Sequence, residues 1–465
     1  MNGRMRDQAP TLLVATLAAA FGVALLQVTG ILAAVFTEND VTGSSGTVRL
    51  MLGIVASVFI TIAVYVSAVV TANTVATIVA GRTRHIALLR LIGSSARAQR
   101  GAIAREGLAI GAIGAVLGGV LGSGAAWVLG EIGVAQGVIP PVERSLLDPV
   151  VLLPMGAVVV TTWLAAWTGS RRVLAVRPVQ ALGNSAEADL DEVSSRVGRA
   201  VAGWVFVILG TLLLVLGVLV GLVRPEGVLI GLVGGILSFT GIVLAAHRVM
   251  PPVLRAVGGV FGARPAERLA AENAVRHPER SARMTIGIVI GVTLVTTFAV
   301  TMESYRTMLA AAFADQPELA REVGPMIDGT VAVFSALIGF SAVIAAVGLV
   351  NTLSISVMQR TRELGLLRAL GFDRRQIRTM VLVEAAALTV AATATGLALG
   401  IVYGWAGAQS MLGSVGASPS IVAPSIPWPI IAIVVAAAAL LTLVASVAPM
   451  RRAARVSPVV ALAVE

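Results

Sequence analysis

The chain has 465 residues, of which 57% are hydrophobic and 12% charged, and its mean hydropathy of +0.93 lies outside the range of soluble globular domains. All of its 34 basic residues are Arg, so it has no Lys for a P-loop or a Schiff base, and without Cys it has no disulfide or thiolate site. Three dispersed His make a poor metal-ligand set, and Arg clusters without interleaved aromatic residues argue against nucleic-acid binding despite a net charge of +10. We therefore expect an integral membrane protein that is not an enzyme by itself and that holds no cofactor or metal.

Apolar stretches of the length needed to cross a bilayer, roughly 20 helical residues, recur along the whole chain. In the first half they occupy residues 11–36, 50–80, 103–130, 150–168 and 201–222. In the second half they occupy residues 228–247, 285–302, 331–357, 380–407 and 428–447. The pattern predicts an all-α membrane protein with about ten transmembrane helices and with both termini on one side.

Loop charges predict the orientation through the positive-inside rule. The loops opposite the termini contain five Arg and eleven acidic residues, which leaves 29 of the 34 Arg and 13 of the 24 acids on the other face. We therefore expect both termini in the cytoplasm. The composition, with Arg in place of Lys and rich in Ala, Val and Gly, is typical of a high-GC bacterial genome, so the expected location is the cytoplasmic membrane of a bacterial cell. The longest external loop, near 303–328, is too short for a large extracellular domain.

An internal repeat divides the chain, because residues 73–122 align without gaps on residues 351–400 at a constant offset of 278. Each copy begins and ends on the predicted cytoplasmic side, so the repeats would be parallel four-helix units. The identical positions include Asn73 with Asn351, Arg82 with Arg360, Leu88, Leu89 and Arg90 with Leu366, Leu367 and Arg368, Gly93 with Gly371, and Glu106 with Glu384. We expect one unit over 1–182, a second over 265–465, and a linker with two connecting helices over 183–264.

Each unit contains a short helix-turn-helix between its second and third transmembrane helices. Apolar residues spaced three apart form a row in both copies, namely Ile86, Leu89 and Ile92 in the first and Leu364, Leu367 and Leu370 in the second. Gly93 and Gly371 stand where a left-handed helix end is expected, and Ser95 or Asp373 would cap the next helix, with Gln376 completing a capping box. Such a loop could be a topology signal alone, but duplication of the whole pattern favours a rigid knob that fits a groove on a cytosolic partner.

The run from Arg360 to Gly371 (RTRELGLLRALG), followed by a basic helix and Glu384, resembles the signature loop of the FtsX-like permease family. These proteins are the membrane subunits of MacB-like, type VII ABC transporters. The segment from Glu272 to Arg280 also resembles the family's entry to the first helix of a unit. The resemblance implies that two copies of a cytosolic ATP-binding subunit, carrying the ATP and Mg, dock on the two loops.

Carried onto this sequence, the resemblance places the coupling contacts in the two loops. In the second loop they are Arg360, Glu363, Leu364, Leu367, Arg368, Ala369 and Gly371. In the first loop they are Arg82, His85, Ile86, Leu89, Arg90 and Gly93. His85 stands where the signature has Glu, which gives the hypothesis that the first loop docks more weakly or in a pH-sensitive way.

Small and amide residues within the spans are expected to pack helices together. Gly114, Gly118 and Gly122 form a small-residue ladder, and Gly396 and Gly400 repeat its lower part. Close packing is the expected role of these glycines, and the same surface could slide during a transport cycle. Asn73 and Asn351, near the inner ends of long helices, are assigned to packing, with gating as the alternative.

Three functions fit these features to different degrees. The first is a permease subunit that exports or extrudes a hydrophobic or amphipathic molecule, such as a peptide, antibiotic or lipid taken from the bilayer, with ATP hydrolysed by a separate subunit. The second is a mechanotransmitting regulator that signals to an envelope partner without transport. The third, an ion-driven secondary transporter, is disfavoured because the spans contain no cluster of ionisable residues and because it gives no reason for duplicated docking loops.

Overall fold

The computed structural model describes residues 2–38, isolated positions between 53 and 72, and residues 88–89, 92–135, 149–170, 190–258, 278–312, 372–414 and 421–453. Within these ranges the regular structure is entirely helical, and no strand occurs. The helices are α1 (Asn2–Glu38), α4 (Ala96–Ala135), η1 (Pro149–Val151), α5 (Leu152–Gly169), α7 (Leu190–Gly221), α8 (Gly227–Gly258), α10 (Pro278–Ala312), α13 (Arg374–Leu412) and α14 (Trp428–Ala453).

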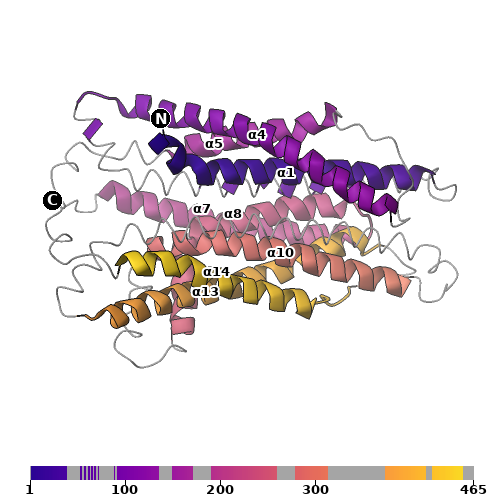
Figure 1. The fold of residues 1–465 in the computed structure, drawn as a ribbon. Helices are drawn as coiled ribbons and strands as arrows, with labels where there is room; N and C mark the ends of the chain where they lie inside the picture. Colours follow the sequence, from indigo (N-terminus) through magenta and orange to yellow (C-terminus); the bar gives the residue numbers. More distant parts are fainter. Residues whose placement is uncertain are drawn as a thin grey trace.

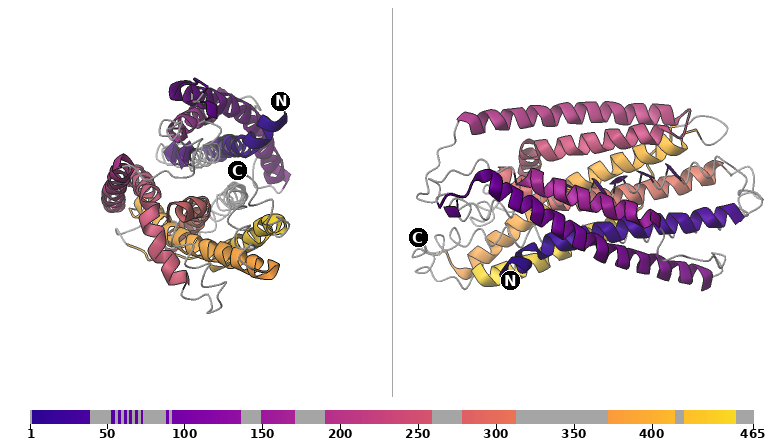
Figure 2. Two further views of the ribbon diagram at one scale, coloured as in Figure 1. Left: turned by 90° about the vertical axis from the view of Figure 1, so that its left-hand side faces the viewer. Right: turned by 90° about the horizontal axis from the view of Figure 1, so that it is seen from above.

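The long helices lie side by side in an elongated bundle (Figure 1). Helix α4 packs on α1 and α5, and these three form one group at the top of the view. Helices α7 and α8 pack on each other along their length, and both also contact α13. Helix α10 packs mainly on α13 and lies near the centre of the bundle when it is viewed end on (Figure 2).

Seven of these helices contain a window long and apolar enough to cross a membrane. The windows are Thr11–Val28, Ala96–Ala135, Leu152–Gly169, Ala200–Gly221, Gly227–Gly258, Thr285–Ala311 and Leu382–Leu412, and α14 adds a shorter apolar stretch, Trp428–Leu440. Eight of the ten predicted spans therefore coincide with described helices. The predicted span 331–357 lies outside the described residues, and the predicted span 50–80 is described only at isolated positions, so the total of ten stays a prediction.

Large apolar side chains cover the outer faces of several helices. Val120 on α4 is 70% exposed and Leu212 on α7 is 62% exposed, and both belong to continuous rows of Leu, Val and Ile. A soluble monomer rarely exposes such surfaces. A helix in lipid makes all of its backbone hydrogen bonds within itself, so it can present apolar side chains to the acyl chains. The exposed rows and the seven windows together describe a multi-pass membrane protein.

Glycine allows close approach in the two long helix pairs α1–α4 and α10–α13. A methyl group added to Gly114 would lie 2.7 Å from Ala15 Cβ, and one added to Gly118 would collide with the Thr16 carbonyl oxygen. A methyl group added to Gly396 would lie 2.8 Å from Val292 Cβ on α10. Contacts of this kind bring helix backbones together and increase the packing contacts that hold helices in lipid.

Glycines also allow α7 to pack closely on α8. A methyl group on Gly217 would lie 2.5 Å from the Gly231 backbone nitrogen, and one on Gly210 would collide with the Ser238 backbone nitrogen. The end of this hairpin reaches α13, because a methyl group on Gly221 would collide with the Ser410 backbone. The two helices therefore form one tightly closed hairpin that is seated on α13.

Two boundaries differ from the sequence prediction. Helix α7 begins at Leu190, before the predicted span 201–222, and α8 continues through Pro251 and Pro252 to Gly258, beyond the predicted span 228–247. An interior Pro costs about 3 kcal/mol or more in a helix, so the continuation of α8 needs a compensating contact. Met250 and Leu254, on either side of the Pro pair, are each only 2% exposed, and this burial provides it.

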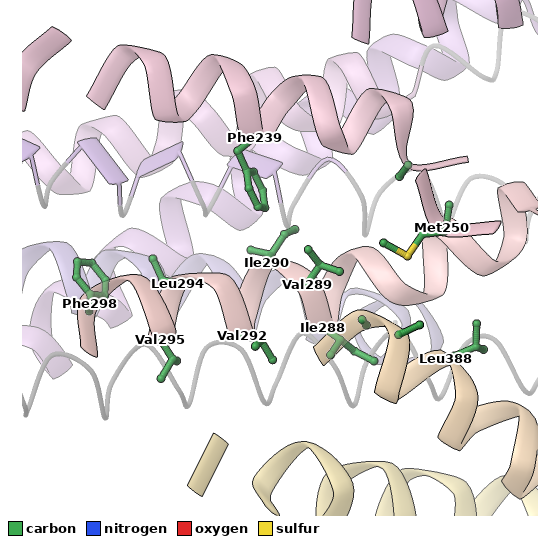
Figure 3. Packing of buried hydrophobic residues seen from close by; sticks show 14 of the residues in the cluster. Phe239, Met250, Ile288, Val289, Ile290, Val292, Leu294, Val295, Phe298 and Leu388 are labelled. Carbon is green, nitrogen blue, oxygen red and sulfur yellow. The ribbon is translucent and has the colours of Figure 1, made fainter. Parts of the chain in front are cut away.

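The main core lies between α8 and α10. Figure 3 shows Phe239 and Met250 projecting from α8 toward Val289 and Ile290 of α10. Leu388 of α13 belongs to the same buried cluster. In its membrane window α10 is 78% buried, the highest share among the seven windows, so it is the central helix of the described bundle.

Candidate functional site

The turn that precedes α4 has a defined backbone. Gly93 has a φ of +99°, and the Ser94 N–H donates to the Leu89 carbonyl at 3.0 Å, which is the long hydrogen bond of a Schellman helix end. Ser95 then caps α4, with its hydroxyl accepting from the Ala98 N–H at 3.1 Å. The predicted left-handed backbone at Gly93 and the predicted cap at Ser95 are both confirmed.

Apolar side chains lie exposed beside this turn. Ile92 is 81% exposed and Leu88 is 48% exposed, whereas Leu89 is partly buried. The other first-loop positions of the predicted coupling set, Arg82, His85, Ile86 and Arg90, lie outside the described residues, as does Asn73. Their role, and that of Leu89 and Gly93, in docking a partner stays a prediction.

The second turn is described from residue 372 onward. The predicted capping box is confirmed, since the Gln376 N–H donates to Asp373 Oδ1 at 2.6 Å and the Asp373 N–H donates to Gln376 Oε1 at 2.9 Å. The predicted contacts in this loop lie outside the described residues, together with Asn351; they are Arg360, Glu363, Leu364, Leu367, Arg368, Ala369 and Gly371. Their coupling role likewise stays a prediction.

The first turn is tied to the end of α5 by Arg100, a contact that the sequence analysis missed. The guanidinium lies 3.9 Å from the Trp167 ring centroid, and its Nε and Nη2 each donate to the Trp167 carbonyl at 3.2 Å. The last carbonyls of a helix have no partner within the helix and carry partial negative charge, so a cation is favourable there. Movement of the turn would therefore be passed on both to α4 and to α5.

Three aromatic rings from distant parts of the chain meet inside the bundle. Phe239 of α8 contacts Tyr65 edge to face at 6.3 Å between centroids, and it contacts Tyr403 of α13 in the same way at 6.4 Å. Edge-to-face pairs at this separation are favourable beyond the area that they bury. The positions described between 53 and 72, called here the Tyr65 segment, are thus joined to α8 and α13 at one aromatic triad, formed by Tyr65, Phe239 and Tyr403.

Each Tyr of the aromatic triad is also fixed by a hydrogen bond to α8. The Tyr65 hydroxyl lies 2.8 Å from the Thr240 hydroxyl, and both hydroxyls can donate to the Ile236 carbonyl, at 3.5 Å and 2.7 Å. The Tyr403 hydroxyl lies 2.8 Å from the Ser238 hydroxyl, which can donate to the Gly235 carbonyl at 3.1 Å. Both Tyr hydroxyls are therefore used within the protein.

Beside the aromatic triad lies a cavity of about 180 Å³. Its walls come from the Tyr65 segment, α7, α8, α10 and α13, and most of its lining side chains are apolar. Little in the sequence indicates the aromatic triad or the cavity. The chain has only three Tyr, and two of them fall inside predicted spans. Among the described residues no group of three or more His, Asp and Glu could hold a metal ion.

The fold and these features define a multi-pass helical membrane protein with a capped, rigid turn and an apolar internal cavity. The family model described as "FtsX-like permease C-terminal" matches this chain twice, over residues 57–178 and over residues 335–458. Together the two segments make up more than half of the chain. The chain belongs to the FtsX-like permease family, whose members include ABC transporter permeases.

Two relatives illustrate this membership. The chain is 27% identical over 165 residues, 36% of its length, to the "Uncharacterized ABC transporter permease YknZ" of Bacillus subtilis. It is 34% identical over 151 residues, 32% of its length, to the "Macrolide export ATP-binding/permease protein MacB" of Rhodopirellula baltica. The matched segments make up 38% and 21% of these two relatives, so the likeness covers well under two thirds of either protein.

Proposed function

We propose that this protein is the permease subunit of an ATP-driven ABC transporter that exports or extrudes a hydrophobic or amphipathic molecule such as a peptide, antibiotic or lipid. The double match to the permease family carries this proposal, since both repeats include the turn and the long helix that follows it. The relatives support it by name, because YknZ is called an ABC transporter permease and MacB a macrolide export protein. The apolar cavity is compatible with a lipophilic cargo.

ATP hydrolysis belongs, in this proposal, to a separate cytosolic subunit present in two copies, one for each turn. The MacB relative is named as both an ATP-binding protein and a permease, whereas this chain has no Lys and therefore no Walker A site of its own. ATP and Mg would be bound by the partner, and this chain would be non-catalytic. Each turn would receive the motion of one ATP-binding subunit and pass it to the helices attached to it.

The proposed architecture is two parallel four-helix units, 1–182 and 265–465, joined by α7 and α8, with ten transmembrane helices in all. The 278-residue offset between the repeats supports it, as does the similar glycine packing of α1 on α4 and of α10 on α13. The Arg distribution supports cytoplasmic termini and a place in the bacterial inner membrane. Both turns would then face the cytosol.

The regulator hypothesis remains the competing function, and one reconstitution distinguishes the two. The chain is purified together with the cytosolic Walker A subunit that binds it, placed in proteoliposomes, and assayed for ATPase stimulation and for movement of labelled lipophilic peptides and drugs. Transport predicts ATP-dependent movement of at least one compound. ATPase activity coupled to an envelope partner, with no compound moved, would favour the regulator.

The Gly93 turn provides a matched variant pair for this assay. Gly93→Val places a β-branched residue at a φ of +99°, which costs about 1–2 kcal/mol and disturbs the turn, whereas Gly124→Val adds its side chain on α4 where no other atom lies within 4 Å of the new Cβ. We expect Gly93→Val to lose stimulated ATPase activity or to bind the subunit more weakly, and Gly124→Val to behave as wild type. Normal coupling in a folded Gly93→Val protein would contradict the proposed role of the turn.

A further inference from the structure

The cavity beside the aromatic triad lies at the depth of the membrane-spanning windows. Its lining includes Leu294 from the window Thr285–Ala311, Gly235 from Gly227–Gly258 and Tyr403 from Leu382–Leu412. Val58, Ile62 and Tyr65 line it from the Tyr65 segment. The cavity is only partly enclosed and all three of these side chains are partly exposed, so it is not sealed inside the bundle.

The hydroxyl groups around the cavity offer little to water. The Tyr65 and Tyr403 hydroxyls are hydrogen-bonded to α8, the Thr301 hydroxyl donates to the Thr297 carbonyl at 2.7 Å, and the Ser410 hydroxyl donates to the Gly407 carbonyl at 3.0 Å. Thr293, which has a buried hydroxyl without a hydrogen-bond partner, and Thr297 also line the cavity. An internal water needs two to four polar partners, and the first four of these hydroxyls are already hydrogen-bonded within the protein, so the cavity offers few partners to a water.

The lining also lacks charge, because no Arg, Asp, Glu or His is among the residues that form the walls. A ligand with a charged head would have to leave that head outside, since burying an unpaired charge in an apolar site is very costly. The space itself comes partly from glycine. At Gly231, Gly235 and Gly407 an added methyl group would meet its nearest neighbour at 3.4 to 3.8 Å, an ordinary contact, so these positions border open volume.

From these observations we propose that the cavity is a binding site for the alkyl chain of an amphiphile. A dry apolar cavity of about 150 Å³ in another protein binds benzene, so about 180 Å³ suits a hydrocarbon of roughly six carbons or a six-carbon stretch of a longer chain. The chain could belong to a bilayer phospholipid or to a single-chain lipophilic solute, and the chemistry of recognition is the same for both. The site stands on its own geometry and does not require that the protein transport its occupant.

Photolabelling of the full chain in phospholipid nanodiscs tests this site directly, without any ATP-binding subunit. One arm uses phosphatidylglycerol with a diazirine in the middle of an acyl chain, and the other uses a diazirine-bearing octanol. Labelled peptides are mapped by mass spectrometry. We expect label on α8, α10 and α13 at residues that line the cavity, from the lipid probe, the octanol probe or both; the arm that labels identifies the source of the chain.

Cavity filling provides the decisive variant. In Gly235→Leu the Cβ meets only Leu214 Cδ1, at 3.8 Å, so the rest of the Leu side chain extends into the cavity. We expect it to lower labelling of the lining residues about ten-fold, a change that corresponds to ~1.4 kcal/mol, while the label on the outer face of α4 is unchanged. Gly124→Leu, the matched control on α4, should leave the cavity label at the wild-type level. Unchanged lining label in Gly235→Leu, or no lining label in wild type with either probe, would overturn the proposal.

A second variant keeps the test valid if Gly235→Leu fails to fold. Thr293→Val has almost the same shape and removes the hydroxyl that lacks a partner, so the cavity becomes more apolar. An alkyl-chain site predicts that its lining label is equal to or above that of wild type. A folded Thr293→Val protein whose lining label falls about ten-fold would instead mean that the hydroxyl is the recognised feature, and the alkyl-chain assignment would be wrong.

Discussion

Helix pairs α1–α4 and α10–α13 are packed alike but are covered differently. In both pairs, glycines on the later helix, α4 or α13, let the backbone of the earlier helix, α1 or α10, approach closely. Among the described helices, α4 is joined outside the pair by α5, whereas α13 is joined by α7, α8 and α14. The buried share of the membrane window is accordingly 39% for α4 and 50% for α13. Within the part of the chain that the structure describes, any movement of α13 therefore involves the α7–α8 hairpin, which has no counterpart on α4.

The packing rows of the two pairs are displaced by one turn. Under the 278-residue offset, Gly118 corresponds to Gly396 and Gly122 to Gly400, but Gly114 corresponds to Ala392, and the second row gains Gly404 instead. A methyl group on Gly404 would lie 2.6 Å from the Thr297 carbonyl oxygen, so this position is as closely packed as the others. The repeats thus keep the mode of contact while shifting its position along the helix.

The largest loss of stability should come from replacing glycines in these packing rows. In Gly118→Ala the methyl group collides with the Thr16 carbonyl, and in Gly400→Ala it lies at 2.5 Å from Thr296 Cβ, so each variant should lose about 3 kcal/mol of stability through overpacking. Gly124→Ala, with open space at the new Cβ, is the control and should not be destabilised. Unfolding of the purified chain, followed by circular dichroism, measures the three. A large loss at only one of the two Gly would break the equivalence of the helix pairs.

The next largest loss of stability should come from the α7–α8 hairpin that packs on α13. Gly210→Ala drives a methyl group into the Ser238 backbone of α8 and should cost about 1–3 kcal/mol in the packing of α7 on α8. Hydrogen exchange should report faster exchange in α7, α8 and the part of α13 that they cover, with α4 unchanged. Uniform acceleration across all helices would show that the hairpin stabilises both halves equally.

The aromatic triad predicts a smaller, paired effect. Tyr65→Phe and Tyr403→Phe each remove one hydrogen bond to α8 and keep the ring contact with Phe239, so each should cost about 0.5–1.5 kcal/mol. Calorimetric unfolding of both variants and of the double variant measures their coupling. A double variant that costs no more than either single one would show that the two bonds act as one unit.

Arg100→Lys, in the first repeat, should have the smallest effect. Lys keeps the charge but loses the planar fork that both stacks on Trp167 and donates twice to its carbonyl. For this partly exposed contact we expect a loss of about 0.5–1 kcal/mol. Thermal unfolding gives this value, and Arg97→Lys, on an exposed neighbour in the same turn of α4, should change nothing. Equal losses in both variants would indicate a general charge effect.

Hydropathy predicted most of the helices because it reports which segments leave water, but it does not report where a helix ends. Helix α4 starts at Ala96 rather than at 103, since Ser95 caps it outside the apolar region. The capping box at Asp373 and the turn at Gly93 could be predicted because both depend on neighbouring residues. The aromatic triad could not, because Tyr65, Phe239 and Tyr403 are far apart in sequence and meet only through tertiary packing.

The continuation of α8 through Pro251 and Pro252 has a mechanical consequence. Neither Pro has an N–H, so the carbonyls of His247 and Arg248 receive no hydrogen bond from the residues four positions ahead. Two successive hydrogen bonds of the helix are therefore absent at one place, so bending α8 there breaks fewer intrahelical bonds than bending it elsewhere. Between Phe239 and its final turns α8 thus has a point at which bending costs least.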